Sequence, residues 1–543
     1  MKDSAFGFDW LVIGSGFGGS VSALRLAEKG YRVGVFERGR RYRDEDFAKS
    51  AWQLGKFLWA PKIGLKGILR MAVFRHVSAV GGAGVGGGSL VYSNTLYRAK
   101  PEFFDNPQWR ALGDWSELLQ QHYDTAEQML GVKTVPFDSV NQQLTREMAR
   151  HFGTEDTVMR TPCAVYFGEQ GVTVRDPYFG GAGPERTGCT RCGNCSIGCR
   201  VGAKNTLVKN YLWFAEKLGV KIFAEHQVVD VKPLGAVDGT DGYLVTTERP
   251  GAWFARDRQT HTARGVIFAS GALGTNELLA NCKHGGSLPR ISDRLGELVR
   301  TNSESILTVR LPEDRKTWND VSISSSVHVN HDTHIELVNW GPKADFMSLS
   351  YTVLVGDGTR LTRPIKWLGS ILLHPFQWLK TILPIGWSRR TVMLLVMQAL
   401  DNAIAFRARK RWFGRGYRLI TEQDRDKPNP SYIEVGNQAA QWLAKHTGGI
   451  AQSNAFEALG NIPNTAHLIG GAVIGVDAAS GVIDHQLHIF GYQNLLVCDG
   501  SAVPANPGVN PSLTITALAE FAMARIPLAK SSRLEEASMV PSI

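Results

Sequence analysis

The sequence predicts an α/β fold in which a parallel sheet with helices is assembled from several chain segments and carries an inserted β-rich domain. Residues 9–37 give a strand, a glycine-rich turn, a helix and a second strand. Small residues follow apolar strands again in 265–279 and from 461 onward, whereas 316–360 alternates apolar and polar residues as strands do. The 543 residues, 43 % apolar and 20 % charged, suffice for two domains with cores.

The first glycine-rich turn has the pattern of a Rossmann-like dinucleotide site. Gly14 permits a tight turn, Gly16 lets the backbone approach a pyrophosphate, and Gly19 lets the following helix pack on the strand. The positive end of the helix that starts near Gly18 would face the pyrophosphate. Glu37 ends the next strand, where a carboxylate accepts from an adenosine ribose without a 2′-phosphate. The alternative is a glycine-rich structural turn.

Three further segments favour FAD over NAD, because the longer FAD needs contacts from distant parts of a chain. A second glycine cluster, Gly84 to Ser89, offers bare backbone N–H groups. Ala269-Ser-Gly271 follows a strand with small residues, and Asp499-Gly500-Ser501 follows another and could reach a ribityl chain.

Together these segments resemble the glucose–methanol–choline (GMC) oxidoreductase family, most closely its cholesterol-oxidase-like branch. The resemblance rests on five segments that span nearly the whole chain in family order, namely 14–37, 84–90, 269–275, His467-Leu-Ile-Gly-Gly471 and 499–516. It implies an FAD-binding domain, predicted at 1–120, 185–305 and 460–530, and a substrate domain, predicted at 121–184 and 306–459, with a tail at 531–543. The FAD contacts it implies together with the motifs are Gly14, Gly16, Phe17, Gly18, Gly19, Glu37, Gly84, Gly86, Gly88, Ser89, Ala269, Gly271, Asp499, Gly500, Asn510 and Pro511. Some members of the family have a flavin-linked histidine, but no His stands immediately after Gly88-Ser89 here, so we expect FAD to be held non-covalently.

The resemblance also implies three catalytic residues. His467 matches the family's active-site histidine and Asn510 its asparagine, while Glu336, in Thr333-His-Ile-Glu-Leu, matches a glutamate of the sterol oxidases. A histidine accepts a hydroxyl proton near neutral pH, while FAD takes the hydride. A glutamate in an apolar cavity has a raised pKa and can move a proton. Structural roles are the alternatives: a cap for Asn510 and a surface position for Glu336.

Four of the seven cysteines, Cys189, Cys192, Cys195 and Cys199, have the spacing of an iron–sulfur run. Zinc in a four-cysteine cage and a reduced, metal-free loop are the alternatives. An odd cysteine count with this crowding argues against a disulfide framework and favours a reducing, cytoplasmic compartment.

Residues 361–406 mix Trp367, Trp378 and Trp387 with Leu, Ile, Lys and Arg. This composition suits either peripheral contact with the inner face of a membrane or a packed helix pair in the substrate domain. The net charge of +10 is consistent with an anionic membrane, and no nucleic-acid-binding motif accompanies it.

The sequence therefore predicts an FAD-dependent oxidoreductase that oxidises the hydroxyl of a bulky, apolar, sterol-like alcohol, with molecular oxygen or a redox partner protein as electron acceptor. The first alternative is an FAD dehydrogenase for sugars or aliphatic alcohols that passes electrons through the cysteine-ligated cluster. The second, of another class, is a catalytically idle flavin- or lipid-binding protein.

Overall fold

The computed structural model describes residues 6–412, 414 and 416–529. The predicted tail at 531–543 lies outside these residues. Two seven-stranded sheets dominate the described chain.

The first sheet contains the two strands that flank the glycine-rich turn. Its order is β12-β2-β1-β15-β14-β13, and β25 pairs with β15. β12, β2, β1, β15 and β25 run parallel, whereas β14 and β13 are antiparallel additions. Because the parallel strands come from distant parts of the chain, their carboxyl ends bring remote segments to one edge. The strands are β1 (Phe8–Ile13), β2 (Val33–Glu37), β12 (Lys221–Ala224), β13 (Gln227–Pro233), β14 (Tyr243–Glu248), β15 (Gln259–Phe268) and β25 (Leu495–Val497).

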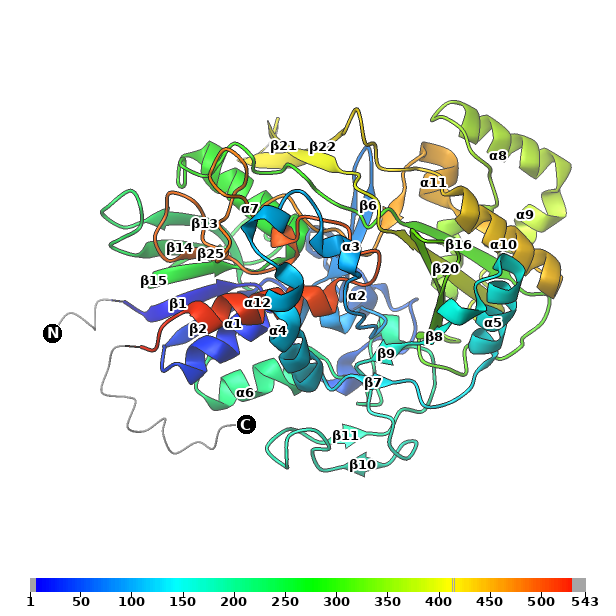
Figure 1. Cartoon of the computed structure of the whole chain (residues 1–543), viewed down its shortest axis with the longest axis horizontal. Coiled ribbons are helices and arrows are strands. Elements are labelled where there is room, and N and C mark those ends of the chain that lie inside the picture. The colour runs from blue at the N-terminus through cyan, green and yellow to red at the C-terminus, as the bar shows by residue number, and fades with distance from the viewer. Residues whose placement is uncertain (1–5, 413, 415, 530–543) are drawn as a thin grey trace.

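Four helices form a layer against this sheet: α1 (Phe17–Glu28), α4 (Trp115–Leu130), α6 (Tyr211–Lys217) and α12 (Ser512–Arg525). α1 packs on α6 and α12, and α12 packs on α4, as Figure 1 shows. α12 has ten buried residues and is buried nearly all round, so it is a core helix. α7 (Gly271–Gly285) follows β15 and contacts β13.

The second sheet has the order β19-β23-β16-β20-β18-β17-β8, and all its pairings are antiparallel. Amphipathic helices α5 (Val140–Phe152) and α10 (Glu434–Thr447) pack their apolar faces on it in one cluster. The strands are β8 (Met159–Arg160), β16 (Ser305–Arg310), β17 (Ile323–His328), β18 (Thr333–Val338), β19 (Tyr351–Val353), β20 (Thr391–Gln398) and β23 (Ile450–Asn454).

Short elements connect and flank the two sheets. The helices are α2 (Leu54–Phe57), α3 (Pro101–Phe104), α8 (Thr362–Leu373), α9 (Pro375–Ile382) and α11 (Ala455–Gly460). The strands are β3 (Trp59–Ala60), β4 (Leu65–Lys66), β5 (Leu69–Val73), β6 (Ser78–Gly82), β7 (Lys133–Thr134), β9 (Pro162–Cys163), β10 (Thr173–Val174), β11 (Arg186–Thr187), β21 (Ile404–Lys410), β22 (Tyr417–Gln423) and β24 (Asn464–Thr465). None of the helices in the described residues is long and apolar enough to cross a membrane.

The predicted α/β class with a Rossmann-like sheet built from several segments is confirmed. The exact domain boundaries stay a prediction. The one drawn between residues 120 and 121 falls inside α4, whose Tyr123 hydroxyl lies 2.8 Å from that of Thr514 in α12.

Candidate active site

The first glycine-rich turn joins β1 to α1. Gly14 has φ of +104°, and a Cβ there would lie 2.3 Å from the Ala269 carbonyl oxygen. A Cβ on Gly18 would lie 1.6 Å from the Cys498 carbonyl oxygen, and one on Gly19 2.0 Å from that of Gly14. These three glycines are therefore required by contacts within the protein.

Gly16 differs from its three neighbours. It is the N-cap of α1, and a Cβ there would meet nothing closer than the Gly87 Cα at 3.9 Å. The fold does not need a glycine at this position. A bare backbone at a helix N-terminus with no acidic residue in its first turn is suited to a pyrophosphate.

Glu37 is buried and connects the two glycine-rich loops. Its Oε2 accepts from the Ser15 hydroxyl (2.8 Å), and its Oε1 accepts from the backbone N–H groups of Gly39 (2.8 Å) and Gly84 (3.3 Å). The predicted contact with a ribose would add to these bonds.

The second glycine-rich loop lies directly beside the first. Gly84, Gly86 and Gly87 have φ of +135°, +106° and +52°, and a Cβ on Gly87 would lie 2.6 Å from the Gly16 Cα. The Gly86 N–H donates to the Ser15 hydroxyl (3.1 Å). Ser89 has a structural role, because its hydroxyl donates to the Gly86 carbonyl (2.7 Å) and accepts from the Leu207 N–H (3.1 Å).

The remaining predicted FAD residues lie around the same edge of the sheet. The ring of Phe17 packs edge-on to that of Tyr92 at 5.4 Å, and a Cβ on Gly88 would touch the Phe17 ring. Asp499, at the end of β25, accepts from the Thr275 hydroxyl of α7 (2.5 Å). The other members occupy the turn before α7, the turn after β25 and the start of α12: Ala269, Gly271, Gly500 and Pro511.

The three residues predicted to be catalytic meet, although they come from remote segments. Asn510 precedes α12, and its Nδ2 donates to Glu336 Oε2 (3.3 Å) and lies 3.5 Å from His467 Nε2. Asn510 is therefore not the helix cap considered from the sequence, and Glu336, on β18, is fully buried rather than at the surface. Glu336 Oε1 and Asn510 Oδ1 are buried and have no hydrogen-bond partner among the described residues. Unpartnered atoms at one buried point suit a bound polar group.

Sequence reasoning missed a fourth residue, Glu304. Its Oε1 bonds His467 Nδ1, and its Oε2 accepts from the Ala466 N–H (2.7 Å). This carboxylate holds the imidazole so that Nε2 faces Asn510. The only local signal was a carboxylate between two serines at the start of β16, which resembles any strand end.

The two glutamates set the proton affinities of the site. Burial raises the pKa of Glu336 to about 8, against the opposing effects of His467 and Asn510. Burial also works to lower the pKa of His467, but the Glu304 carboxylate outweighs it and raises that pKa above its usual value. At neutral pH the site therefore holds a protonated carboxylic acid beside a histidine of increased basicity.

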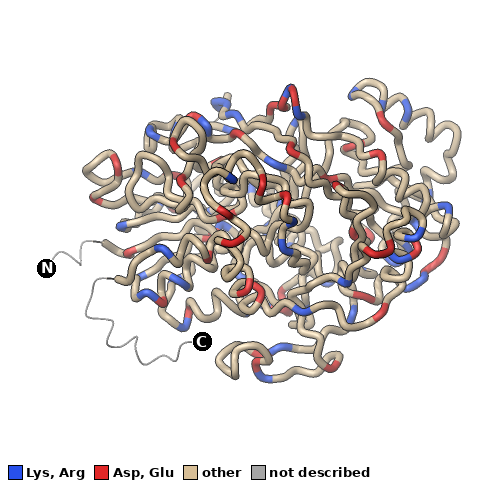
Figure 2. Tube along the Cα trace, in the orientation of Figure 1, with Lys and Arg blue, Asp and Glu red and all other residues tan. Residues whose placement is uncertain are grey.

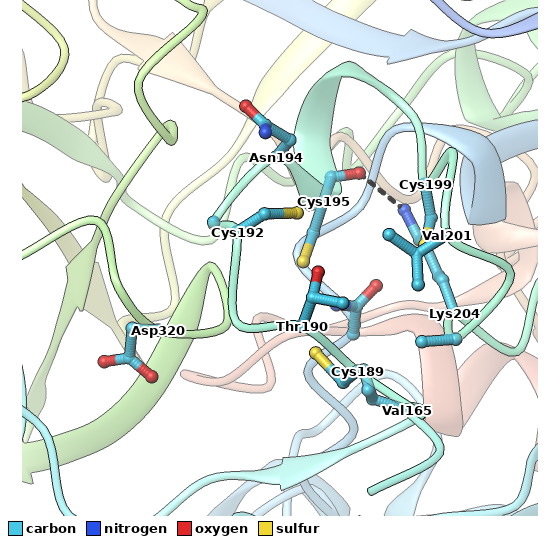
Figure 3. Close-up of a pocket in the computed structure, with 13 residues that line it drawn as sticks. Val165, Cys189, Thr190, Cys192, Asn194, Cys195, Cys199, Val201, Lys204 and Asp320 are labelled. Carbon is cyan, nitrogen blue, oxygen red and sulfur yellow. Dashed lines mark hydrogen bonds between the residues drawn. The ribbon is translucent and has the colours of Figure 1, made fainter. Parts of the chain in front are cut away.

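The four cysteines of the 189–199 segment line a small cavity, drawn in Figure 3. Its free volume of about 20 Å³ is room for about one water molecule, not for a cluster. No three His, Cys, Asp or Glu residues in the described chain are placed to hold one metal ion. The predicted iron–sulfur site and its zinc alternative are therefore not supported.

A buried lysine stabilises this cysteine segment instead. Lys204 Nζ donates to the carbonyls of Leu90 (3.2 Å), Tyr92 (2.8 Å) and Cys195 (3.0 Å), and Figure 3 marks the last of these bonds. Burial lowers the pKa of Lys204 to about 8. The segment is thus attached to the chain that leaves the second glycine-rich loop.

The arrangement defines a class of protein: a Rossmann-like oxidoreductase with a buried histidine, asparagine and carboxylic acid. Residues 12–42 match the model of the NAD(P)-binding Rossmann-like domain, and 397–519 match that of the GMC oxidoreductase. The chain is 45 % identical to a cholesterol oxidase of Acinetobacter baumannii over 99 % of this chain and 97 % of that one. It is 46 % identical to one of Mycobacterium tuberculosis over 95 % and 90 %.

Among solved structures, pyridoxine 4-oxidase from Mesorbium loti is similar, with a TM-score of 0.60 and 14 % identity over 95 % of this chain and 98 % of that one. At that identity the likeness concerns the fold alone. The chain belongs to the GMC oxidoreductase family, and it is an FAD-dependent enzyme that acts on an alcohol. Gly16 and the bare second glycine loop fit the cofactor.

Proposed function

We propose that this enzyme oxidises the hydroxyl of a sterol-like alcohol to a ketone and passes the electrons to molecular oxygen. The observation that carries the proposal is the similarity, along nearly the whole chain, to relatives described as cholesterol oxidases. The meeting of His467, Asn510 and Glu336 supports it, because the resemblance implies a family role for the first two and a sterol-oxidase role for Glu336.

The chain's own residues would bind the hydroxyl and move its proton. FAD, when bound, supplies the acceptor for the hydride that leaves the carbinol carbon. His467 Nε2 accepts the hydroxyl proton, while Glu304 holds the proton on Nδ1. Asn510 Nδ2 donates to the substrate oxygen and orients it.

Glu336 is protonated at neutral pH because its pKa is about 8. Its free Oε1 faces no protein donor or acceptor among the described residues. The acid form can therefore give a proton at a second position of a bound ring, a role that differs from that of His467.

An anaerobic visible spectrum tests the proposal. Addition of a 3β-hydroxysterol should bleach the flavin bands, and readmission of air should restore them with one hydrogen peroxide per sterol oxidised. Sugars and linear alcohols, added in parallel, should leave the bands unchanged. Flavin that stays oxidised with the sterol but bleaches with a sugar or a linear alcohol would refute the substrate class. Bands that stay bleached in air would refute oxygen as acceptor.

A further inference from the structure

α8 and α9 form a hairpin at one end of the molecule (Figure 1), and it exposes several large apolar side chains. Leu372 is 73 %, Leu373 77 % and Phe376 79 % exposed. Further exposed apolar residues on and beside the two helices are Leu361, Ile365, Leu368, Leu379 and Ile385. Soluble surfaces rarely gather so many large apolar side chains in one place, so this surface is suited to a partner.

Two of the three tryptophans on which the sequence prediction rested pack toward the body of the molecule instead of this surface. Trp387 is fully buried and stacks on Tyr351 at 5.4 Å. Trp367 points back to the body, where its Nε1 donates to the Thr352 hydroxyl (2.8 Å). Both hold the hairpin in place, and Leu, Ile and Phe make the exposed side.

The charge within this segment of the sequence has one sign. Between Asp357 and Asp401 the sequence has no acidic residue but six Lys or Arg residues, of which Arg389 pairs with Asp314 (3.8 Å). Figure 2 shows where the basic residues of the molecule lie. Basic residues beside an exposed apolar helix surface favour an anionic lipid interface over a protein partner of mixed charge.

A polar cavity of about 240 Å³ lies at the base of the hairpin. Arg75, His76 and Arg360 line it, and none of the described residues in its wall is acidic. Arg363, in the first turn of α8, donates to the Ser431 carbonyl (2.8 Å) and to Asn461 Oδ1 (3.0 Å), both in the same wall. Arg363 therefore links the base of the hairpin to the wall of the cavity.

The two arginines in this wall have no carboxylate partner among the described residues. Arg360 donates to the backbone carbonyl of Arg75, which brings two like charges together. The acidic residue that acts on His76, Glu422, is already paired with Arg407 (2.9 Å). Converging cations without a carboxylate favour a bound anion.

Two amide side chains in the wall, of the buried Asn429 and the half-buried Gln423, each have a buried atom without a partner among the described residues. Asn429 Nδ2 is a donor and Gln423 Oε1 an acceptor, and neither has a partner in the described chain. Buried polar atoms are rarely left unpaired, so each indicates a ligand group. A phosphate diester of a hydroxyl-bearing headgroup offers acceptors to the arginines and Asn429 and a hydroxyl to Gln423.

We propose that this face docks on an anionic phospholipid bilayer, with α8 and α9 in the interface and one lipid phosphate in the cavity of Arg75, His76 and Arg360. This goes beyond the proposed oxidation and does not depend on it. It gives the enzyme a place to meet a water-insoluble substrate.

Co-sedimentation with sterol-free vesicles tests the proposal. The full-length flavoprotein should bind vesicles that contain phosphatidylglycerol about tenfold more tightly than phosphatidylcholine vesicles, and added salt should weaken this binding. The pair Arg75→Gln/Arg360→Gln and the pair Leu372→Ser/Phe376→Ser should each weaken binding about tenfold. Arg256→Gln/Arg258→Gln removes the same charge from the loop between β14 and β15 and should bind as the wild type does.

The flavin spectrum of each variant serves as the check of folding, since all six positions lie outside the predicted cofactor site. Inorganic phosphate, tested by thermal shift, separates the two sources of the anion. Phosphate that stabilises a protein without affinity for vesicles would overturn the lipid proposal in favour of a free-anion site. Equal binding to both vesicle types, or unchanged binding of the Arg75→Gln/Arg360→Gln pair, would also overturn it. Because no sterol is present, these outcomes are independent of whether the enzyme oxidises sterols.

Discussion

The glycine-rich turn at 14–19 and the cysteine segment at 189–199 are both short motifs with a specific spacing, but only the first has the geometry that its spacing predicts. In the turn, the Ala269 and Cys498 carbonyls leave no room for a side chain at Gly14 and Gly18. A Cβ on Gly87 of the second loop would meet the Gly16 Cα, whereas Gly16 itself is left open to a ligand. In the cysteine segment the four thiols line a cavity of about 20 Å³, and Lys204 attaches the loop.

The difference follows from what each motif needs. A dinucleotide turn acts through its backbone, so the strand and helix that flank it set the course of the chain, while carbonyls from remote strand ends exclude side chains from it. A cluster needs four side chains that converge at ligand distance, and spacing alone fixes neither their rotamers nor the space between them. Comparison of glycine variants with a cysteine variant tests this distinction.

The largest effect is expected within the turn itself. Gly18→Ala places a Cβ 1.6 Å from the Cys498 carbonyl, so α1 must move away from the end of β25. We expect a loss of unfolding free energy of about 3 kcal/mol or more. Gly16→Val should leave stability nearly unchanged but abolish flavin binding, since a Cβ there meets nothing closer than the Gly87 Cα at 3.9 Å.

Flavin content and chemical denaturation of both variants measure the two effects separately. A Gly16→Val protein that keeps its full yellow colour would contradict the assignment of the pyrophosphate site. Equal stability loss in both variants would show that Gly16 is structural as well.

The next effect concerns His467, whose position depends on contacts with residues that are remote in sequence. His467→Ala removes the proton acceptor and should slow anaerobic flavin reduction by about 10²–10⁴-fold with flavin still bound. Stopped-flow absorbance with a 3β-hydroxysterol measures the rate. A rate within a factor of two or so of wild type would exclude His467 as the base.

Glu304→Gln sharpens the same point, because Gln keeps a hydrogen-bond acceptor for Nδ1 but removes the charge. The Glu304 carboxylate raises the pKa of His467, so its loss should lower that pKa. Since the base must be unprotonated, the rise of the reduction rate with pH should move to lower pH, and the limiting rate should fall about tenfold. A fall in rate with an unmoved pH profile would indicate a purely structural role for Glu304.

These cases show how much of the molecule the sequence predicts. The strand–turn–helix of residues 8–28 and the acidic residue at the end of the next strand follow from local pattern, although remote residues such as Ala269 and Cys498 complete the packing around the glycines. Glu304 does not, because it meets His467 across 163 residues, and a carboxylate at a strand end gives no sign of its partner. The sequence also does not predict the burial of Trp387. The composition of residues 361–406 suits an interface, but it cannot show which aromatic side chain packs inward, as Trp387 does on Tyr351.

A smaller effect concerns stability rather than rate. The pKa of Glu336 is about 8 in the fold against 4.5 for the free group, so the folded state binds a proton more tightly than the unfolded state. Its contribution to stability is therefore fully present below pH 4.5 and is lost as the pH rises toward 8. Glu336→Gln should reduce this decline by about 1 kcal/mol or more between pH 5 and 8.

Urea denaturation of both proteins at several pH values measures this difference. Glu457→Gln is a suitable comparison, because burial raises the pKa of that carboxyl to about 7 and it accepts from the Ser305 hydroxyl instead of from a catalytic residue. If the wild type and Glu336→Gln decline in parallel, Glu336 is ionised in the fold and cannot serve as a proton donor at neutral pH.

The smallest effect is expected in the cysteine segment. If the four thiols hold no cluster, Cys192→Ser exchanges a half-buried thiol for a hydroxyl and should change the unfolding free energy by less than about 1 kcal/mol. Iron and labile sulfide should be at background in both proteins, with flavin content equal, and Cys282→Ser, at a buried cysteine outside the segment, is the matched control. Iron present in the wild type and lost only in Cys192→Ser would mean that the thiols rearrange around a cluster, and that here, too, local spacing is sufficient to predict the site.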